Sequence, residues 1–358
     1  MKIAIIGNGG IAHTHVKELK SLGHDVSAVV GRDKERTKDF AKQYDIETYS
    51  DDIAIVLAPE IDCVHICTPP ALHYEMVKLV LNAGKHVICE KPLCIDAAQA
   101  KELADLAKEK HVVAAIDFNV RYYGACRQMK EILEQQKLGQ LCLIHGSYLQ
   151  EFHALPEANS WRYQEQLGGK MRAVTEIGSH YMDLVRFVTG LEVLEVSADF
   201  GSFTPKRYVK DGIMYEESLE GSREILVASE DAAILSFRLS NGALGNVVLS
   251  EVSHGRSNYL HIELTGTKQS VWWNSEDCNR LNTSQKGKGI CSKLNAFDGG
   301  FDDTVGRLFA DVYNAIQFGN EAHAYPDFMD GYINLSICEA IYESNQKNGA
   351  WTKVCVEV

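Results

Sequence analysis

The first twelve residues, MKIAIIGNGGIA, constrain the fold of this chain more than any other stretch. Residues 2–6 are mostly branched and apolar and end in a glycine-rich turn, which is the pattern of a fully buried parallel strand. The turn reads G-x-G-x-x-A over Gly7, Gly9 and Ala12, which is typical of a dinucleotide-binding strand–helix unit. The sequence therefore predicts a dinucleotide site after the first strand.

Each residue type in this turn has a physical task. Gly7 permits the tight turn, Gly9 lets the backbone approach a pyrophosphate without a Cβ between them, and Ala12 lets the next helix lie close to the strand. A helix over about 12–22 would direct its N-terminal N–H groups and its dipole at the phosphates. The predicted cofactor contacts are Gly7, Gly9, Gly10, Ile11 and Ala12. A purely structural glycine turn is the alternative.

Length and charge exclude several classes of protein. A chain of 358 residues suggests about two domains, each able to bury its own core. The net charge of −13 disfavours a nucleic-acid or anionic-membrane partner, because phosphates would be repelled. No apolar run approaches the roughly 18 residues of a membrane span, and the N-terminus is a predicted strand rather than a signal peptide. We expect a cytoplasmic protein.

The ten cysteines are scattered and contain no C-x-x-C pair. Cys63, Cys67 and Cys89 lie in strongly apolar runs, where cysteine often behaves as a small buried hydrophobe. Reduced thiols are therefore expected rather than disulfides or a zinc site.

About 120 residues then alternate between apolar strands and amphipathic helices. The predicted strands are 25–30, 61–67, 85–89 and 112–117, and the predicted helices are 34–44, 74–83 and 97–110. Such alternation indicates a parallel, doubly wound sheet, that is, an α/β fold of the Rossmann type. We expect residues 1–121 to form this NAD(P)-binding domain.

The end of the second strand bears on the choice of cofactor. A NAD-binding fold usually has an acidic residue there for the ribose hydroxyls, but this chain has Gly31-Arg32-Asp33. Arg32 is well placed to meet a 2′-phosphate, which favours NADP over NAD. Alternatively, Arg32 is a solvated residue and Asp33 is the N-cap of the next helix.

Two further turns fall at the carboxyl edge of the predicted sheet, where nucleotides bind in such folds. The first contains Thr68, Pro69 and Pro70, followed by His73, and its prolines impose an extended turn. His73 is either a site residue or only the polar first turn of a helix, whereas His65 inside the preceding strand is expected to be a core histidine.

The second turn is Glu90-Lys91-Pro92. A lysine at the carboxyl end of a parallel strand faces the cofactor side of the sheet, and Glu90 can orient or tune its ammonium group. Partial desolvation would suit Lys91 to proton transfer. An exposed loop lysine is the alternative.

Together these motifs resemble the glucose–fructose oxidoreductase and inositol dehydrogenase family (Gfo/Idh/MocA). The resemblance extends to Phe118-Asn119 with Arg121 and continues through the second half of the chain in Gly168-Gly169, in the segment from Glu176 to Asp183, and in Tyr325-Pro326-Asp327-Phe328. It implies an NAD(P)-dependent oxidoreductase, with Asn119 at the cofactor and Arg121 at the substrate. Glu176 is a departure, because the family commonly has aspartate there, and the extra methylene moves the carboxylate by about one C–C bond.

Residues 175–189 have the pattern of an amphipathic helix, with the apolar stripe Ile177, Tyr181, Leu184, Val185 and Val188. Glu176, His180 and Asp183 then lie at i, i+4 and i+7 on one face, where two carboxylates can orient and tune the histidine for proton transfer. A metal could use the same spacing, but there is no H-E-x-x-H pattern and the resemblance implies none. A helix whose histidine makes ordinary hydrogen bonds is the structural alternative.

From about residue 141 the sequence changes to longer strands and hairpins. The predicted strands are 141–149, 193–200, 232–239, 244–252 and 259–266, with a further strand around 272–273. The resemblance implies that residues 122–358 form an α+β domain with a large, open, mostly antiparallel sheet that joins a homodimer or homotetramer. Its final helices, 303–318 and 329–346, could pack back toward the first domain. Residues 275–300 read as a loop and a possible lid.

Trp161 and Arg162 precede the 175–189 helix and suit stacking on, and hydrogen bonding to, a sugar; packing anchors are the alternative. We therefore expect hydride transfer between nicotinamide and a sugar, polyol or related carbinol, with Lys91 and His180 exchanging the hydroxyl proton and Glu176 and Asp183 positioning His180. Two other functions remain open: an NAD-dependent glycosidase with transient oxidation, and a non-enzymatic regulator that senses a dinucleotide or sugar.

Overall fold

The computed structural model describes residues 1–158, 160–295, 299–319 and 325–357, and the chain forms two compact units. The first comprises residues 1–122 and 299–335, and the second comprises residues 123–298 and 336–358. The long helix α9 (Phe328–Gln346) contributes its first residues, up to Leu335, to the first unit and the rest to the second.

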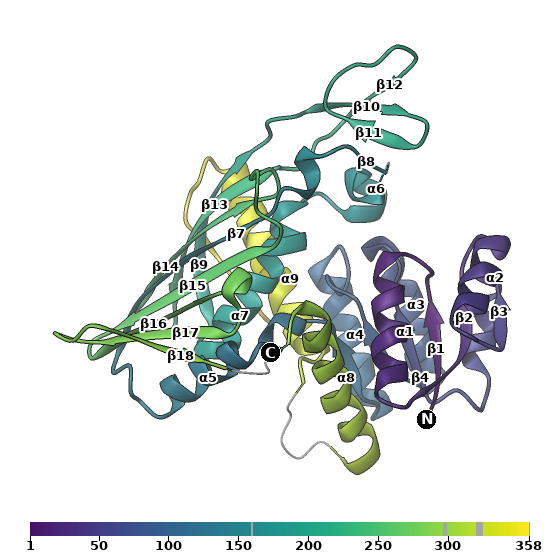
Figure 1. The fold of residues 1–358 in the computed structure, drawn as a ribbon, viewed down its shortest axis with the longest axis horizontal. Coiled ribbons are helices and arrows are strands. Elements are labelled where there is room, and N and C mark those ends of the chain that lie inside the picture. The colour runs from purple at the N-terminus through teal and green to yellow at the C-terminus, as the bar shows by residue number, and fades with distance from the viewer. Residues whose placement is uncertain (159, 296–298, 320–324, 358) are drawn as a thin grey trace. The chain divides into compact units, whose positions relative to one another are not determined.

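The first unit is built on one parallel six-stranded sheet in the order β3-β2-β1-β4-β5-β6 (Figure 1). Its strands are β1 (Lys2–Ile6), β2 (Asp25–Val30), β3 (Thr48–Ser50), β4 (Cys63–Ile66), β5 (His86–Cys89) and β6 (Ala114–Ile116). This order is that of the doubly wound dinucleotide-binding fold. The prediction of a parallel Rossmann-type sheet is confirmed, although the short edge strand β3 was not foreseen.

Helices pack on this sheet and close its core. They are α1 (Gly10–Ser21), α2 (Lys34–Gln43), α3 (His73–Asn82), α4 (Ala97–Lys110) and α8 (Phe301–Phe318), with the short helices η1 (Ile53–Leu57), η2 (Pro70–Leu72) and η3 (Asn119–Tyr122). From the far end of the sequence, α8 packs against α1 and adds Leu308 and Phe309 to the core that contains Ile3, Ile5 and Val16.

Local chemistry fixes where these helices begin. The Asp33 carboxylate accepts the backbone N–H of Arg36 and so caps α2, which was one of the two alternatives for this turn. Asp96 caps α4 in the same way through the N–H of Gln99. The cysteines predicted to be buried, Cys63, Cys67 and Cys89, are buried in and beside β4 and β5.

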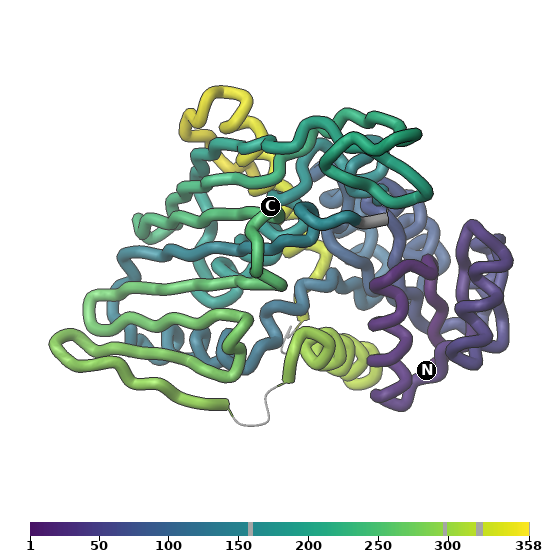
Figure 2. The backbone as a smooth tube through the Cα atoms, turned by 45° about the horizontal axis from the view of Figure 1, so that its top comes forward, coloured from purple at the N-terminus to yellow at the C-terminus, as the bar shows by residue number. Residues whose placement is uncertain are grey.

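The second unit is built on a nine-stranded sheet in the order β18-β17-β16-β15-β7-β14-β13-β9-β19. Its long strands run side by side as one broad layer in Figure 2. Its strands are β7 (Leu141–Leu149), β9 (Val193–Gly201), β13 (Ala232–Leu239), β14 (Leu244–Ser250), β15 (Tyr259–Gly266), β16 (Gln269–Asn274), β17 (Arg280–Gln285), β18 (Ile290–Leu294) and β19 (Thr352–Lys353). Neighbouring strands are antiparallel except for the β7–β14 pair. The predicted large, mostly antiparallel sheet is confirmed.

Helix α7 (Ser179–Thr189) packs against α5 (Gly124–Glu134) beside this sheet (Figure 1). The predicted apolar stripe of residues 175–189 is buried throughout. The residues before α7 form a π-helix, η6 (Val174–Gly178), rather than a first turn of α-helix. The remaining short helices of this unit are η4 (Phe152–Ala154), η5 (Trp161–Tyr163), α6 (Glu165–Gly168) and η7 (Ser275–Asp277).

A separate four-stranded sheet, not foreseen from the sequence, has the order β12-β10-β11-β8. Its strands are β8 (Glu157–Ala158), β10 (Lys206–Lys210), β11 (Ile213–Tyr215) and β12 (Arg223–Leu226). It encloses a small core around Tyr163, Met214 and Val227.

The prediction that residues 275–300 form a loop was wrong for most of this segment. After η7 the chain forms the hairpin β17–β18, which extends the sheet at its edge. All five residues of β18 are exposed, so this strand lacks the apolar alternation by which a half-buried strand is recognised. Residues 296–298 lie outside the described part of the chain.

Among the helices that the structure describes, none has both the length and the apolar character needed to cross a membrane.

Candidate active site

The glycine turn between β1 and α1 is formed as the sequence predicted. Gly7 has φ +107°, and a Cβ placed on it would lie 2.5 Å from the carbonyl oxygen of Cys67 at the end of β4. Its N–H donates to the carbonyl of Val30 at 2.7 Å, which binds the turn to the end of β2. Only glycine combines this backbone conformation with so close an approach.

The next residues leave an open backbone surface at the start of α1. A Cβ on Gly9 or Gly10 would meet nothing within 4 Å, and Gly9 caps α1 without a side-chain hydrogen bond. The N–H groups of residues 9–11 are therefore available to an anion, whereas the N–H of Ala12 donates to the carbonyl of Gly9 at 3.1 Å. Ala12 is fully buried, and Ile11 is partly exposed. These features fit the pyrophosphate of a dinucleotide, which would be held by backbone N–H groups of residues 9–11, with the small Ala12 packed beneath them.

The end of β2 has no room for the acidic residue usual in NAD-binding folds. A Cβ on Gly31 would lie 2.5 Å from Oγ1 of Thr37 and 2.7 Å from Nδ2 of Asn8, and those two atoms are hydrogen-bonded at 3.0 Å. Arg32 is exposed, and Arg36 donates to the carbonyl of Asn8 at 3.4 Å. Residue 31 therefore offers no carboxylate, and two guanidinium groups lie near it beside the Asp33 carboxylate that caps α2.

His73 joins the two turns that follow β4 and β5. It is fully buried, with Nε2 2.7 Å from the carbonyl of Thr68 and Nδ1 2.9 Å from that of Pro92. Burial lowers its pKa, although the two carbonyls act in the opposite direction. Thr68 and Pro69 are partly exposed, so they can meet a ligand directly while His73 fixes the path of the backbone.

Glu90 and Lys91 follow β5 directly. Glu90 is buried, and its Oε2 accepts the backbone N–H of Lys91 at 3.2 Å, while Lys91 is partly exposed. One carboxylate therefore holds the backbone of the predicted proton-transfer residue at the carboxyl edge of the sheet.

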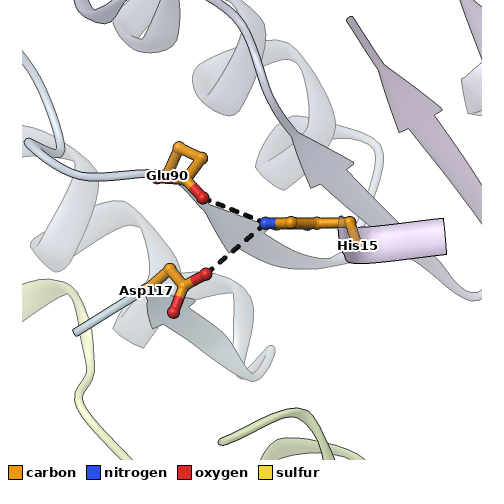
Figure 3. Close-up of side chains that lie close together, drawn as sticks. All are labelled: His15, Glu90 and Asp117. Carbon is orange, nitrogen blue, oxygen red and sulfur yellow. Dashed lines mark hydrogen bonds and ion pairs between the residues drawn. The ribbon is translucent and has the colours of Figure 1, made fainter. Parts of the chain in front are cut away.

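Sequence reasoning missed the partners of Glu90. Oε1 of Glu90 lies 3.0 Å from Nε2 of His15 on α1, and Oδ2 of Asp117, after β6, lies 3.4 Å from the same nitrogen (Figure 3). Burial raises the pKa of Asp117 to about 6. The predicted topology contained the signal for this cluster. Glu90 and Asp117 directly follow neighbouring strands of a parallel sheet, and His15 lies shortly after the glycine turn at the same edge.

Asn119 and Arg121 lie on η3 and are both buried. Asn119 donates to Oγ1 of Thr304 on α8 at 2.8 Å, and Arg121 forms an ion pair with Asp330 on α9 at 3.1 Å. Both side chains therefore connect η3 to the C-terminal helices of the first unit. Their contacts with cofactor and substrate stay predictions.

In the second unit, the proposed acid–base residues Glu176, His180 and Asp183 span the junction of η6 and α7. His180 and Asp183 are buried, and the Glu176 side chain is 17% exposed. Glu176 lies on a wider π-turn, so the prediction of one regular α-helix from residue 175 was wrong for its first turn, while the shared face of the three residues stays a prediction; single π-turns within helices are frequent at functional sites.

Arg162 is the described partner of Glu176. Its Nε lies 2.8 Å from Oε2 of Glu176, and its guanidinium stacks on Trp161 with 4.6 Å between the guanidinium carbon and the ring centroid. The predicted pair Trp161–Arg162 is thus linked to the segment that carries His180, and Trp161 stays partly exposed.

A buried charged cluster behind Glu176 was not predicted. Carboxylate and imidazole atoms of His153, Glu176 and Glu251 lie within 4.8 Å of one another, and Nε of Arg172 lies 2.9 Å from Oε2 of Glu251. Arg172 also forms an ion pair with Asp231. Burial raises the pKa of Glu251, with Glu176 contributing in the same direction.

The chain matches two family models that cover most of its length. Residues 1–118 match the model described as an oxidoreductase family with an NAD-binding Rossmann fold, and residues 126–272 match the GFO/IDH/MocA C-terminal domain. An uncharacterized oxidoreductase of Synechocystis is 31% identical over 77% of this chain and 72% of its own length.

Named relatives align over nearly the whole chain. Levoglucosan dehydrogenase of Pseudarthrobacter phenanthrenivorans is 29% identical over 88% of this chain and 85% of its own. A solved structure of levoglucosan dehydrogenase with NADH and L-sorbose superposes with a TM-score of 0.92 at 27% identity, covering 99% of each chain. With both family models matched in order, the chain belongs to the Gfo/Idh/MocA family of oxidoreductases.

Proposed function

We propose that this protein is an NAD(P)-dependent dehydrogenase that oxidises a CH–OH group of a sugar, a polyol or a related carbinol, or reduces the matching keto-sugar. The observation that carries the proposal is Lys91, placed at the carboxyl end of β5 and held there by Glu90, in the same parallel sheet as the open glycine turn. The likeness to levoglucosan dehydrogenase supports a carbohydrate substrate.

The reaction separates a hydride from a proton. Oxidation of CH–OH to C=O releases one hydride and one proton, and a bound nicotinamide supplies the hydride acceptor at C4. The chain supplies the acceptor for the hydroxyl proton, a role that we assign to Lys91 and His180. In the reverse direction the same groups return the proton to the alkoxide oxygen.

Other residues hold these groups and the ligands. Residues 9–11 bind the pyrophosphate through backbone N–H groups, and Thr68 and Pro69 border the cofactor. Asp183 and Glu176 position His180, and the ion pair with Arg162 limits where the Glu176 carboxylate can go. Trp161 and Arg162 suit stacking on, and hydrogen bonding to, a sugar.

We further propose that NADP(H) is preferred over NAD(H). Thr37 and Asn8 occupy the place of an acidic side chain at Gly31, and Arg32 is the exposed cation beside it. A 2′-phosphate would be attracted by Arg32, whereas the ribose hydroxyls of NAD would find no carboxylate at residue 31, where NAD-binding folds usually have one. The solved levoglucosan dehydrogenase contains NADH, so the preference proposed here would separate the two proteins.

A homodimer or homotetramer through the nine-stranded sheet completes the proposal. On its open face, Ile234 and Val248 are cross-strand partners that are 57% and 38% exposed. Leu244 and Leu143 form a second such pair, 51% and 40% exposed. Exposed apolar side chains gathered on one face of a sheet are typical of a protein–protein contact.

The first experiment is cofactor analysis of the purified protein. We expect an empty or exchangeable site that binds NADPH more tightly than NADH in a fluorescence titration, followed by turnover at 340 nm on a panel of levoglucosan, L-sorbose and other sugars and polyols. NAD that co-purifies, does not exchange and is not consumed would instead indicate the glycosidase reaction. Binding without turnover on the whole panel would indicate a regulator, and binding of neither nucleotide would contradict the proposal.

A further inference from the structure

His15, Glu90 and Asp117 form a buried charged cluster to which the proposed reaction assigns no role (Figure 3). His15 is fully buried, and Nε2 of its ring faces both Oε1 of Glu90 at 3.0 Å and Oδ2 of Asp117 at 3.4 Å. An ionised carboxylate can only accept a hydrogen bond. Nε2 of His15 must therefore carry a proton.

The opposite nitrogen of the ring faces a second histidine. Nδ1 of His15 lies 2.9 Å from Nδ1 of His65 on β4, and Nε2 of His65 lies 2.7 Å from the hydroxyl of Tyr313 on α8. One proton must lie between the two Nδ1 atoms, because two bare nitrogens repel and two N–H groups collide. Either His15 carries it and is an imidazolium, or His65 carries it and His15 is neutral.

The surrounding charges favour the first arrangement. If His15 were neutral, its ring would offer the two buried carboxylates no opposite charge, and a buried charge without a partner is strongly unfavourable. Burial by itself lowers the pKa of His15, but Cys67, Asp117 and Glu90 outweigh it and raise the pKa well above the usual value. Burial lowers the pKa of His65 well below that value, which leaves His65 neutral.

Glu90 connects this cluster to the proposed reaction. Its two oxygens are engaged on different partners, Oε1 with His15 on α1 and Oε2 with the backbone N–H of Lys91. Helix α1 begins at the glycine turn, so the same carboxylate links the helix of the proposed pyrophosphate site to the lysine segment. A displaced Glu90 would no longer accept the backbone N–H of Lys91.

We propose that His15 is a positioning residue: as a buried imidazolium it holds Glu90 and Asp117 in place and, through Glu90, fixes the backbone at Lys91. This inference rests on the proposed role of Lys91 in proton transfer. His65 and Tyr313 keep the ring in the orientation that presents Nε2 to both carboxylates.

Charged and titratable groups reach His15 from several elements. Glu90 follows β5 and Asp117 follows β6, while His65 lies on β4 and Cys67 follows it. Tyr313 of α8 contacts His65 rather than His15 itself. Phe309 of α8 also packs edge-on against the His15 ring, with centroids 4.8 Å apart. Lys91 and His73 act on Glu90 electrostatically.

The direct test is the protonation state of His15 in the full-length protein. Long-range proton–nitrogen NMR spectra of ¹⁵N-histidine-labelled protein distinguish an imidazolium from either neutral tautomer. We expect an imidazolium signal that persists to pH 8, and that is absent from the His15→Gln variant. A neutral His15 ring at pH 7 would overturn the proposal.

Asp117→Asn provides a second variant if His15→Gln does not fold. It removes one of the two carboxylates and keeps the shape of the side chain, so the His15 titration should move to lower pH by about one unit or more. An unchanged titration would overturn the assignment of His15 as the cation of this cluster.

The effect of His15 on Lys91 is measured in two ways, by hydrogen exchange of the Lys91 amide and by enzyme kinetics. Hydrogen exchange of the Lys91 amide, which donates to Glu90, should become at least tenfold faster in His15→Gln, and kcat should fall by a similar factor with a shifted pH profile while KM changes little. His86→Gln, at the start of β5, is the matched control and should retain the wild-type values. Unchanged exchange and an unchanged pH profile in His15→Gln would overturn the proposal. The wild-type protein could show no turnover while the His15 imidazolium signal and the faster Lys91 exchange in His15→Gln are both observed. That outcome would contradict only the proposed enzyme function.

Discussion

A Cβ on Gly7 would lie 2.5 Å from the carbonyl oxygen of Cys67, so the end of β4 lies directly against the turn that follows β1. Gly7 also has a positive φ of 107°. The two constraints act together at one residue, whereas a Cβ on Gly9 would meet nothing within 4 Å. The glycines of one motif therefore have separable tasks, Gly7 for the fold and Gly9 for the ligand.

This separation predicts different outcomes for two alanine variants. Gly7→Ala should lower the free energy of unfolding by about 2 kcal/mol or more, because backbone strain of ~1–3 kcal/mol adds to the contact with Cys67. Gly9→Ala should change it by under about 1 kcal/mol, yet weaken nucleotide binding more than tenfold. Urea unfolding and nucleotide titration measure the two effects. Equal losses of stability in both variants would contradict the assignment.

Lys91→Met should abolish proton transfer and retain the fold. We expect kcat to fall by about 10²–10⁴-fold, the range typical of a general acid–base group, with nucleotide affinity within about threefold of wild type. Lys108→Met, at an exposed position of α4, is the control and should have wild-type kinetics. Steady-state kinetics and NADPH titration provide the comparison, and a Lys91→Met variant with more than a tenth of wild-type kcat would exclude this role.

Arg32→Ala should lower affinity for NADPH about tenfold and leave affinity for NADH within twofold. A charged hydrogen bond to a phosphate is worth about 1.5–3 kcal/mol, and about 1.4 kcal/mol corresponds to tenfold in affinity. Lys38→Ala is the control, because Lys38 is exposed on the same helix α2 but pairs with Glu35. Fluorescence titrations with both nucleotides measure these affinities. An equal loss of affinity for NADPH and NADH would mean that Arg32 does not bind the 2′-phosphate.

Glu230 should make the protein less stable as pH rises. Burial raises its pKa from 4.5 to about 7, so between these values the native state binds a proton that the unfolded chain has lost, and the free energy of unfolding falls with pH. Glu230→Gln keeps an acceptor for the N–H groups of Arg172 and Val174 and removes the charge. The variant should match wild type near pH 4.5 and exceed its stability at pH 8. Thermal unfolding of both proteins at pH 4.5 and pH 8 tests this. An equal difference in stability at the two pH values would contradict the prediction.

Ile234→Lys should dissociate the proposed oligomer without unfolding the subunit. Ile234 is 57% exposed opposite Val248, so a charge there meets solvent in a monomer but would be desolvated in a sheet-mediated contact. Light scattering after size exclusion should show a smaller assembly. Ile290→Lys, on the exposed edge strand β18, is the control, and dissociation by both variants or by neither would speak against this face.

Much of the secondary structure could be predicted because local patterns determine it. The limits of β2, β7, β13, β15 and α4 match the expected ranges, since alternating or continuous apolar residues bounded by turn residues mark them. The β17–β18 hairpin and the four-stranded sheet were missed because they are exposed or short, so burial leaves little periodicity in their sequences.

The sequence by itself determined the glycine turn, the order of most strands and helices, and the positions of Glu90, Lys91 and the segment around His180. Tertiary structure decided which side chains act on them. His15 and Glu90 are 75 residues apart, and His65 and Tyr313 are 248 apart, so no local spacing could pair them. Packing of a parallel sheet brings the ends of β4, β5 and β6 together beneath α1 and α8, and burial then requires each charge placed there to find a partner.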